Sequence, residues 1–104
     1  MTSVANQTLD IVYQGIDALA PYTSNARTHS KSQIRKIAES IRSFGFTNPI
    51  LVDKANTIMA GHGRVEAAKI LGLAEVPTIR LESLTPAQVR AYVIADNRLA
   101  EEAG

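Results

Sequence analysis

The pattern of apolar and polar positions changes period several times along the chain, and each change predicts a different element. An apolar, β-branched run at 9–16 predicts a first strand. Two short apolar runs at 49–53 and 57–60, separated by a tight turn, predict a β-hairpin. A fourth run at 76–81 alternates apolar and polar residues around Pro77. We expect this last strand near an edge of the sheet, because proline cannot donate to the ladder.

Helical spacing occurs in three other segments. The first helix is predicted after the capping box of Ser30 and Gln33, and Gly45 is expected to end it because glycine tolerates a left-handed backbone. Its apolar side chains recur three and four residues apart and therefore share one face, formed by Ile34, Ile37, Ala38, Ile41 and Phe44. A second helix is predicted at about 64–71 and a third after the cap Thr85. This order of elements predicts an α+β fold, a small mixed sheet with three helices.

Length and composition limit the classes of function. A chain of 104 residues with 45% hydrophobic residues suits one core, so we expect a flexible N-terminus at 1–8 and a single domain at 9–104. No apolar run approaches the roughly 18 residues that span a bilayer, and no secretory signal is evident, which predicts no membrane association and a cytoplasmic location. The absence of cysteine excludes disulfides, thiolate nucleophiles and cysteine metal sites, and two histidines alone make no zinc site.

The formal net charge of +1 conceals a local asymmetry. Five basic residues and one acid lie between Arg27 and Arg42, whereas five basic and six acidic residues lie between Gly61 and the end of the chain. A cluster of basic residues can attract phosphate groups. A solvated helix face explains the same cluster, so the charge pattern leaves both interpretations open.

The junction from Met59 to Ala68 is the most informative segment, because a predicted strand runs through two glycines directly into a predicted helix. The first turn of a helix has backbone N–H groups without partners, and the helix dipole favours an anion there. Glycines let a phosphate approach the backbone, and an arginine can clamp it. The candidate phosphate-binding residues are Gly61, His62, Gly63 and Arg64. The alternative is an ordinary turn with an exposed histidine and a solvated arginine.

Two further segments carry groups suited to a nucleotide. Arg27 and the hydroxyls that cap the first predicted helix can reach a second phosphate. Asp96 and Asn97 offer hard oxygen ligands, and Mg²⁺ is often held by one carboxylate together with nucleotide phosphates. Taken singly, each segment is equally explained as a loop, a cap or a solvent-exposed helix surface.

Together and in this order, the three segments resemble the ParB/sulfiredoxin superfamily, specifically its ParB-like N-terminal (ParB nuclease-like) domain, over roughly 11–100. Asn25-Ala26-Arg27 and the following segment up to Val52 resemble the first box of the family, and Gly61 to Lys69 resembles the second. Asp96-Asn97 resembles the third. The ending at 96–101 is most similar to phage-type domains found ahead of DNA methyltransferases. The resemblance therefore implies a ParB/sulfiredoxin-like fold and predicts that the chain is a fragment of a longer protein.

In partition proteins of this family the boxes form a CTP site with Mg²⁺, and some members hydrolyse the nucleotide. The resemblance assigns phosphate binding to four residues and metal binding to two, namely Gly61, Gly63, Arg64 and Arg27, and Asp96 and Asn97. This chain departs from the second box at three positions: His62 replaces an acidic residue, Gly63 an arginine and Glu66 a basic residue. Sulfiredoxins carry a catalytic cysteine in this loop, so a chain without cysteine has no such activity.

The leading hypothesis is a nucleotide-binding module, for CTP or ATP with Mg²⁺, in a DNA-associated protein of partitioning or DNA modification. Whether it is a weak nucleoside triphosphatase stays open. The first alternative is a direct DNA-binding or nuclease-like domain, although Asp96 is the only candidate acid beside the loop, which disfavours two-metal cleavage. The second is a degenerate protein-interaction scaffold. The implied partners are a nucleotide and DNA, the latter bound directly or through a missing domain, and a homodimer is left open.

Overall fold

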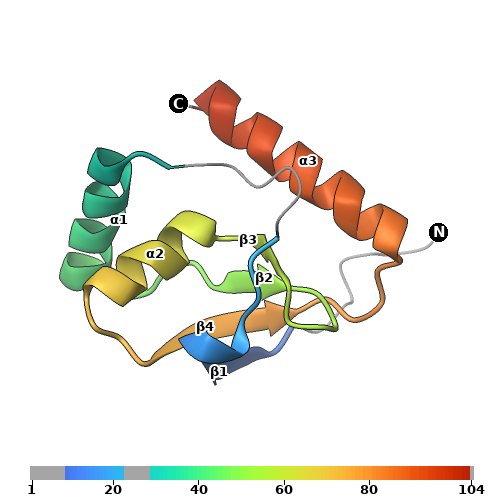
Figure 1. The fold of residues 1–104 in the computed structure, drawn as a ribbon, viewed down its shortest axis with the longest axis horizontal. Coiled ribbons are helices and arrows are strands. Elements are labelled where there is room, and N and C mark those ends of the chain that lie inside the picture. The colour runs from blue at the N-terminus through green and yellow to red at the C-terminus, as the bar shows by residue number, and fades with distance from the viewer. Residues whose placement is uncertain (1–8, 23–28, 104) are drawn as a thin grey trace.

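The computed structural model describes residues 9–22 and 29–103, and the side chains of these residues up to Asp96. Its elements are β1 (Ile11–Gly15), a short 3₁₀ helix (Ile16–Ala18), α1 (Lys31–Phe44), β2 (Ile50–Val52), β3 (Ile58–Ala60), α2 (His62–Ile70), β4 (Glu75–Arg80) and α3 (Pro86–Ala103). The strands form one sheet in the order β1-β4-β2-β3 (Figure 1). Because β2 and β4 run parallel while the other pairs are antiparallel, the predicted mixed sheet with three helices is confirmed.

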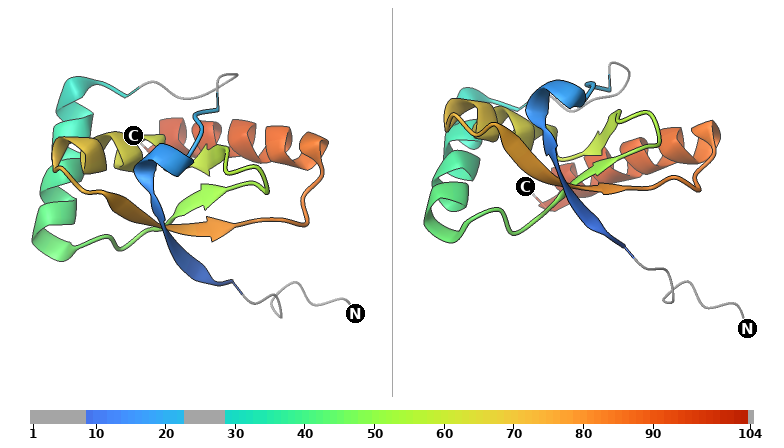
Figure 2. Two further views of the ribbon diagram at one scale, coloured as in Figure 1. Left: turned by 60° about the horizontal axis from the view of Figure 1, so that its bottom comes forward. Right: turned by 90° about the horizontal axis from the view of Figure 1, so that it is seen from below.

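The core lies on both faces of the sheet, because successive strand residues point to opposite sides. Ile50 and Val52 of β2 belong to a buried cluster with Val65 of α2. Leu51, the residue between them, packs against a second cluster that includes Val93 of α3. Helices α2 and α3 therefore cover opposite faces of the sheet, and α1 packs mainly against α2 (Figures 1 and 2). No helix in the described residues is long and apolar enough to cross a membrane.

The position of β4 differs from the prediction made from Pro77. The strand lies between β1 and β2, in the interior of the sheet rather than near its edge. Pairing with β2 begins one residue later, with Ile50 opposite Thr78. The missing N–H of Pro77 therefore lies beside Pro49, ahead of the β2 ladder, where no hydrogen bond is lost.

The first predicted helix is confirmed together with both of its ends. Ser30 and Gln33 form the complete capping box, and Gly45 follows the helix with a φ of 79°. The prediction that Phe44 belongs to the buried apolar face is wrong, because this residue is 78% exposed. It occupies the last position of the helix, directly before Gly45 turns the chain away.

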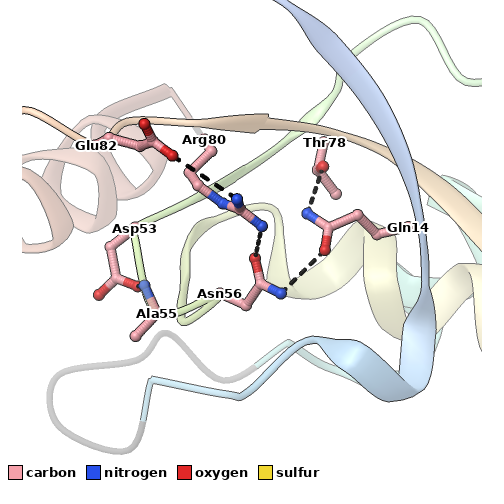
Figure 3. Close-up of polar contacts among 7 residues, drawn as sticks. All are labelled: Gln14, Asp53, Ala55, Asn56, Thr78, Arg80 and Glu82. Atoms are coloured by element: carbon pink, nitrogen blue, oxygen red, sulfur yellow. Dashed lines mark hydrogen bonds and ion pairs between the residues drawn. The ribbon is translucent and has the colours of Figure 1, made fainter.

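A polar network holds the β2–β3 turn against β1 and β4 (Figure 3). The amide of Gln14 in β1 donates to Thr78 Oγ1 at 2.8 Å, and its oxygen accepts from Asn56 Nδ2 at 3.0 Å. Asn56 in turn accepts a hydrogen bond from Arg80 at 2.8 Å. Asn56 has a φ of 63°, a left-handed conformation that asparagine tolerates in tight turns. The network therefore positions the hairpin that leads into the candidate site.

Candidate functional site

The candidate site begins where β3 passes into α2. Gly61 has a φ of 107° and a ψ of 19°, in the left-handed region, and it precedes the first helical residue, His62. The helix therefore begins two residues earlier than the sequence predicts, and His62 and Gly63 lie in its first turn rather than in a loop. The left-handed residue turns the chain sharply enough that the helix follows the strand directly.

The N-terminus of α2 differs from those of the other two helices. In α1 the Ser30 hydroxyl accepts from the Gln33 N–H, and in α3 the Thr85 hydroxyl accepts from the Gln88 N–H. These hydroxyls cap their own helices, and the prediction that the caps of α1 also reach a phosphate stays a prediction. Gly61 supplies no side-chain cap to α2. The first-turn N–H groups of α2, together with the helix dipole, are therefore suited to an external anion.

Arg64 lies in the first turn of α2, and most of its side chain is buried. Its Nη2 donates to the carbonyl oxygen of Pro49 at 3.1 Å, which ties the helix to the start of β2. Its Nε is buried and has no hydrogen-bond partner. Burial lowers the pKa of Arg64, while the Asp96 carboxylate and, after it, the Tyr92 phenol act in the opposite direction. Arg64 is therefore not the fully solvated arginine of the alternative interpretation, and its guanidinium keeps one donor without a partner.

His62, the first residue of α2, is half-buried against the segment that follows the 3₁₀ helix. Its Nε2 accepts a long hydrogen bond of 3.4 Å from the backbone N–H of Tyr22. Burial lowers the pKa of His62 below its ordinary value of 6.5, and the imidazole of His29 lowers it further. The carboxylates of Asp96 and Glu66 act in the opposite direction without cancelling the burial. His62 is thus not the freely exposed residue of the alternative interpretation.

Gly63 is buried because α1 approaches α2 at this point. A Cβ atom placed on Gly63 would lie 2.9 Å from Ile37 Cδ1 and 3.1 Å from His29 Nε2. Both distances are shorter than ordinary van der Waals contacts, so a larger residue would require the side chains of Ile37 and His29 to shift. Gly63 therefore determines how closely His29 comes to the N-terminus of α2.

The structure brings together most of the predicted site residues that it describes. Gly61, His62, Gly63 and Arg64 form one end of α2, and Asp96 of α3 acts electrostatically on both His62 and Arg64. Arg27 lies outside the described residues, as does the side chain of Asn97. Their predicted roles therefore stay predictions.

Two neighbours of the site were missed in the sequence. Tyr92 interacts electrostatically with Arg64 and Asp96. Burial raises the pKa of Tyr92, and the Asp96 carboxylate raises it further. Its spacing of four residues from Asp96 places both on one helix face, which is a usable signal. His29 is adjacent to the capping box, and no pattern in the sequence predicts its approach to Gly63.

Asp96 is the acid of α3 whose side chain the structure describes, and its role at a metal stays a prediction. Among the residues with described side chains, no group of three or more His, Cys, Asp or Glu could hold a metal ion. A magnesium ion at Asp96 would therefore need ligands from a bound nucleotide, from water or from Asn97. Mg²⁺ commonly takes one or two carboxylates and completes its shell in this way.

The lowered pKa of His62 predicts a pH dependence of stability. Below about pH 6.5 the unfolded chain takes up a proton that the folded chain resists, so the free energy of unfolding falls as the pH decreases. We expect urea denaturation to show lower stability at about pH 5.5 than at about pH 7.5. His62→Gln, which retains a hydrogen-bond acceptor, should show a smaller difference. An equal difference in both proteins would assign the effect to other groups, such as His29.

Comparison with known proteins assigns the chain to a family. Residues 2–97 match the ParB N-terminal domain. The chain belongs to the ParB N-terminal domain family. Its relatives include the ParB-like nuclease domain-containing protein YnaK of Escherichia coli, which is 49% identical over 83 residues. That match covers 80% of this chain and 95% of YnaK. A probable chromosome 2-partitioning protein ParB of Deinococcus radiodurans is 37% identical, over 72% of this chain but only 26% of its own length.

Solved structures agree with this ParB assignment. The truncated chromosome-partitioning protein ParB of Caulobacter crescentus, complexed with CTP-γ-S, superposes with a TM-score of 0.74 and 28% identity, over 85% of this chain and 52% of that one. The same protein complexed to the centromeric parS site gives a TM-score of 0.69 and 26% identity, over 83% of this chain and 46% of that one. Sulfiredoxin of Arabidopsis thaliana shares the fold, with a TM-score of 0.67 and 22% identity, over 81% of this chain and 97% of its own. The ParB/sulfiredoxin-like fold is thereby confirmed.

Proposed function

We propose that this chain is a nucleotide-binding module of ParB type, binding CTP or ATP with Mg²⁺, in a protein that acts on DNA. The observation that carries the proposal is the N-terminus of α2, which has no side-chain cap and holds Arg64 with a buried, unpartnered Nε. The Caulobacter ParB that superposes on this chain was solved with CTP-γ-S, which supports a nucleotide as the ligand. Chromosome or plasmid partitioning and DNA modification are the two proposed settings.

In this proposal each residue has a separate task. The N–H groups at the start of α2 donate to phosphate oxygens, and Gly61 leaves the backbone accessible. Arg64 contributes its positive charge beside the phosphates, while its Nη2 remains on Pro49. Arg27 assists at the phosphates, and Asp96 and Asn97 approach the magnesium ion. The ion itself would neutralise charge on the phosphates.

Three positions distinguish this site from the second box of partition proteins. His62, Gly63 and Glu66 stand where that box has an acid and two basic residues. The site therefore has fewer fixed positive charges for a triphosphate. We infer that the chain uses backbone donors more and side-chain cations less than the partition proteins do.

Calorimetric titration with CTP, ATP and GTP, each with Mg²⁺, tests the proposal. We expect saturable binding of at least one nucleotide and a loss of at least tenfold in affinity for Arg27→Ala, about 1.4 kcal/mol. Arg42→Ala is the matched control, because Arg42 is exposed at the far end of α1 and pairs with Glu39. The absence of heat with all three nucleotides, with the protein shown to be folded, contradicts nucleotide binding and favours the scaffold alternative.

Direct DNA binding is a second candidate, favoured by the charge on α1. Lys31, Arg35, Lys36 and Arg42 are all exposed on this helix. Contacts of this kind to phosphates give an affinity that decreases steeply with salt. A gel shift at low salt that weakens in Arg35→Ala/Lys36→Ala supports it, and the absence of a shift at low salt excludes it. The C. crescentus ParB complexed to parS supports DNA as the partner of the wider protein.

A further inference from the structure

The outer edge of β1 carries exposed apolar residues that the nucleotide site does not explain. β1 is the first strand in the sheet order and pairs only with β4 among the described residues. Its three leading residues, Ile11, Val12 and Tyr13, are 57%, 55% and 63% exposed. An edge strand normally carries a charge, a proline, a bulge or a cover that prevents pairing with another chain. The sequence of β1, Ile-Val-Tyr-Gln-Gly, contains no charged residue and no proline.

The first three residues of β1 are apolar and exposed on both faces of the strand, whereas Gln14 and Gly15 are partly buried. Successive residues point to opposite faces, so Val12 lies on one face while Ile11 and Tyr13 lie on the other. A strand that buries one face would show alternating exposure, but these three neighbours are exposed alike. Helix α3 covers the side of the sheet near β3 and does not extend over β1 (Figure 2).

The hydrogen bonds of β1 show which backbone groups face outward. The Val12 carbonyl accepts from Thr78 Oγ1 of β4 at 2.7 Å, and the Ile16 N–H donates to the Ala74 carbonyl at 3.0 Å. Because alternate residues of an antiparallel edge strand face its neighbour, the even positions face β4. The N–H and C=O groups of Ile11, Tyr13 and Gly15 therefore point to the open edge.

We propose that β1 pairs antiparallel with β1 of a second copy of this chain, with Tyr13 at the two-fold axis. In this register Tyr13 of each copy faces Tyr13 of the other, and Ile11 faces Gly15. The backbone N–H and C=O groups that point away from β4 in one copy therefore meet the same kind of groups in the other. The pairing is isologous and closed, as most homodimers are. The two four-stranded sheets become one sheet of eight strands, within the usual range.

Charge and side-chain fit favour a second copy over a charged peptide. No charged residue of β1 could attract such a peptide. In the proposed register Asp10 faces Ile16 of the second copy, so no like charges oppose each other. The net charge of +1 also produces little repulsion between whole molecules. The two tyrosines fall opposite each other, where aromatic cross-strand pairs stabilise a sheet.

Sedimentation or light scattering without nucleotide, from micromolar to millimolar protein, tests the pairing independently of the nucleotide site. We expect the molar mass to rise toward twice that of one chain. Tyr13→Lys should remain monomeric at concentrations where the wild type is dimeric, because two ammonium groups would meet at the axis. Phe44→Lys is the matched control, since Phe44 is also an exposed aromatic residue but lies on α1, and it should dimerise like the wild type.

A charge-swap experiment tests the register. Tyr13→Lys and Tyr13→Glu should each be monomeric alone, and an equal mixture should contain a larger dimer fraction than either variant alone. A wild type that stays monomeric at every concentration overturns the proposal, as does a dimer that Tyr13→Lys leaves intact. A mixture as monomeric as its components overturns the register and with it the proposal. Protection of the Tyr13 amide from hydrogen exchange in dilute monomer overturns it too, because the edge is then covered within the chain.

Discussion

Replacement of Gly61 by alanine should lower the free energy of unfolding by about 3 kcal/mol. A Cβ atom at this position would lie 2.8 Å from Ile50 Cδ1 and 3.0 Å from a terminal nitrogen of Arg64. Its φ of 107° adds a conformational cost of about 1–2 kcal/mol for a residue with a side chain. The contact with Ile50 adds about 1–3 kcal/mol, because Ile50 is fully buried and cannot move aside.

Gly72→Ala separates the two causes. Gly72 also has a left-handed backbone, with a φ of 74°, but no atom lies within 4 Å of its added Cβ. We therefore expect a loss of only about 1 kcal/mol, from conformation alone. Chemical denaturation of both variants measures the difference. Equal losses would contradict the tight packing of Gly61 between β2 and Arg64. If the proposed nucleotide binds, Gly61→Ala should also abolish that binding under conditions where the variant is folded.

Arg64→Gln is expected to lower the free energy of unfolding by about 2 kcal/mol. The change removes the donor to the Pro49 carbonyl and the partly buried positive charge that Asp96 stabilises. A buried group that loses its partner costs about 1–3 kcal/mol. Arg64→Lys should recover part of this loss, because lysine restores the charge but not the planar guanidinium.

Arg42→Gln is the control for Arg64→Gln. Arg42 is exposed and forms an ion pair with Glu39 on the surface of α1. Surface pairs of this kind contribute about 0–1 kcal/mol, so we expect little change in the denaturation midpoint. If Arg64→Gln behaved like Arg42→Gln, the link between α2 and the start of β2 would not contribute to stability.

Most of the fold could be predicted from the sequence, because its elements carry local signals. The capping boxes at Ser30 and Thr85 and the terminating Gly45 depend on neighbouring residues alone, and all three are present in the structure. Pro77 was misleading because its effect depends on the strands beside it. A proline in an interior strand is harmless where the adjacent ladder has not begun, and no local pattern shows this.

The candidate site divides in the same way. The two glycines and Arg64 follow one another in the chain, so their grouping at the start of α2 could be predicted. The approach of His29 and Tyr92 depends on the packing of α1 against α2 and on the position of α3. The burial of Arg64 and its hydrogen bond to Pro49 also required the tertiary structure.

The sequence by itself therefore determined the order of the elements, the caps of two helices and the uncapped glycine turn ahead of α2. These features follow from backbone preferences and from contacts between residues a few positions apart. Only the tertiary structure decided that β4 is central, that Arg64 is largely buried and that, among the described residues, the outer edge of β1 has no partner strand. Those features depend on which distant surfaces meet, because the same apolar run is buried beneath a helix or exposed where no helix covers it.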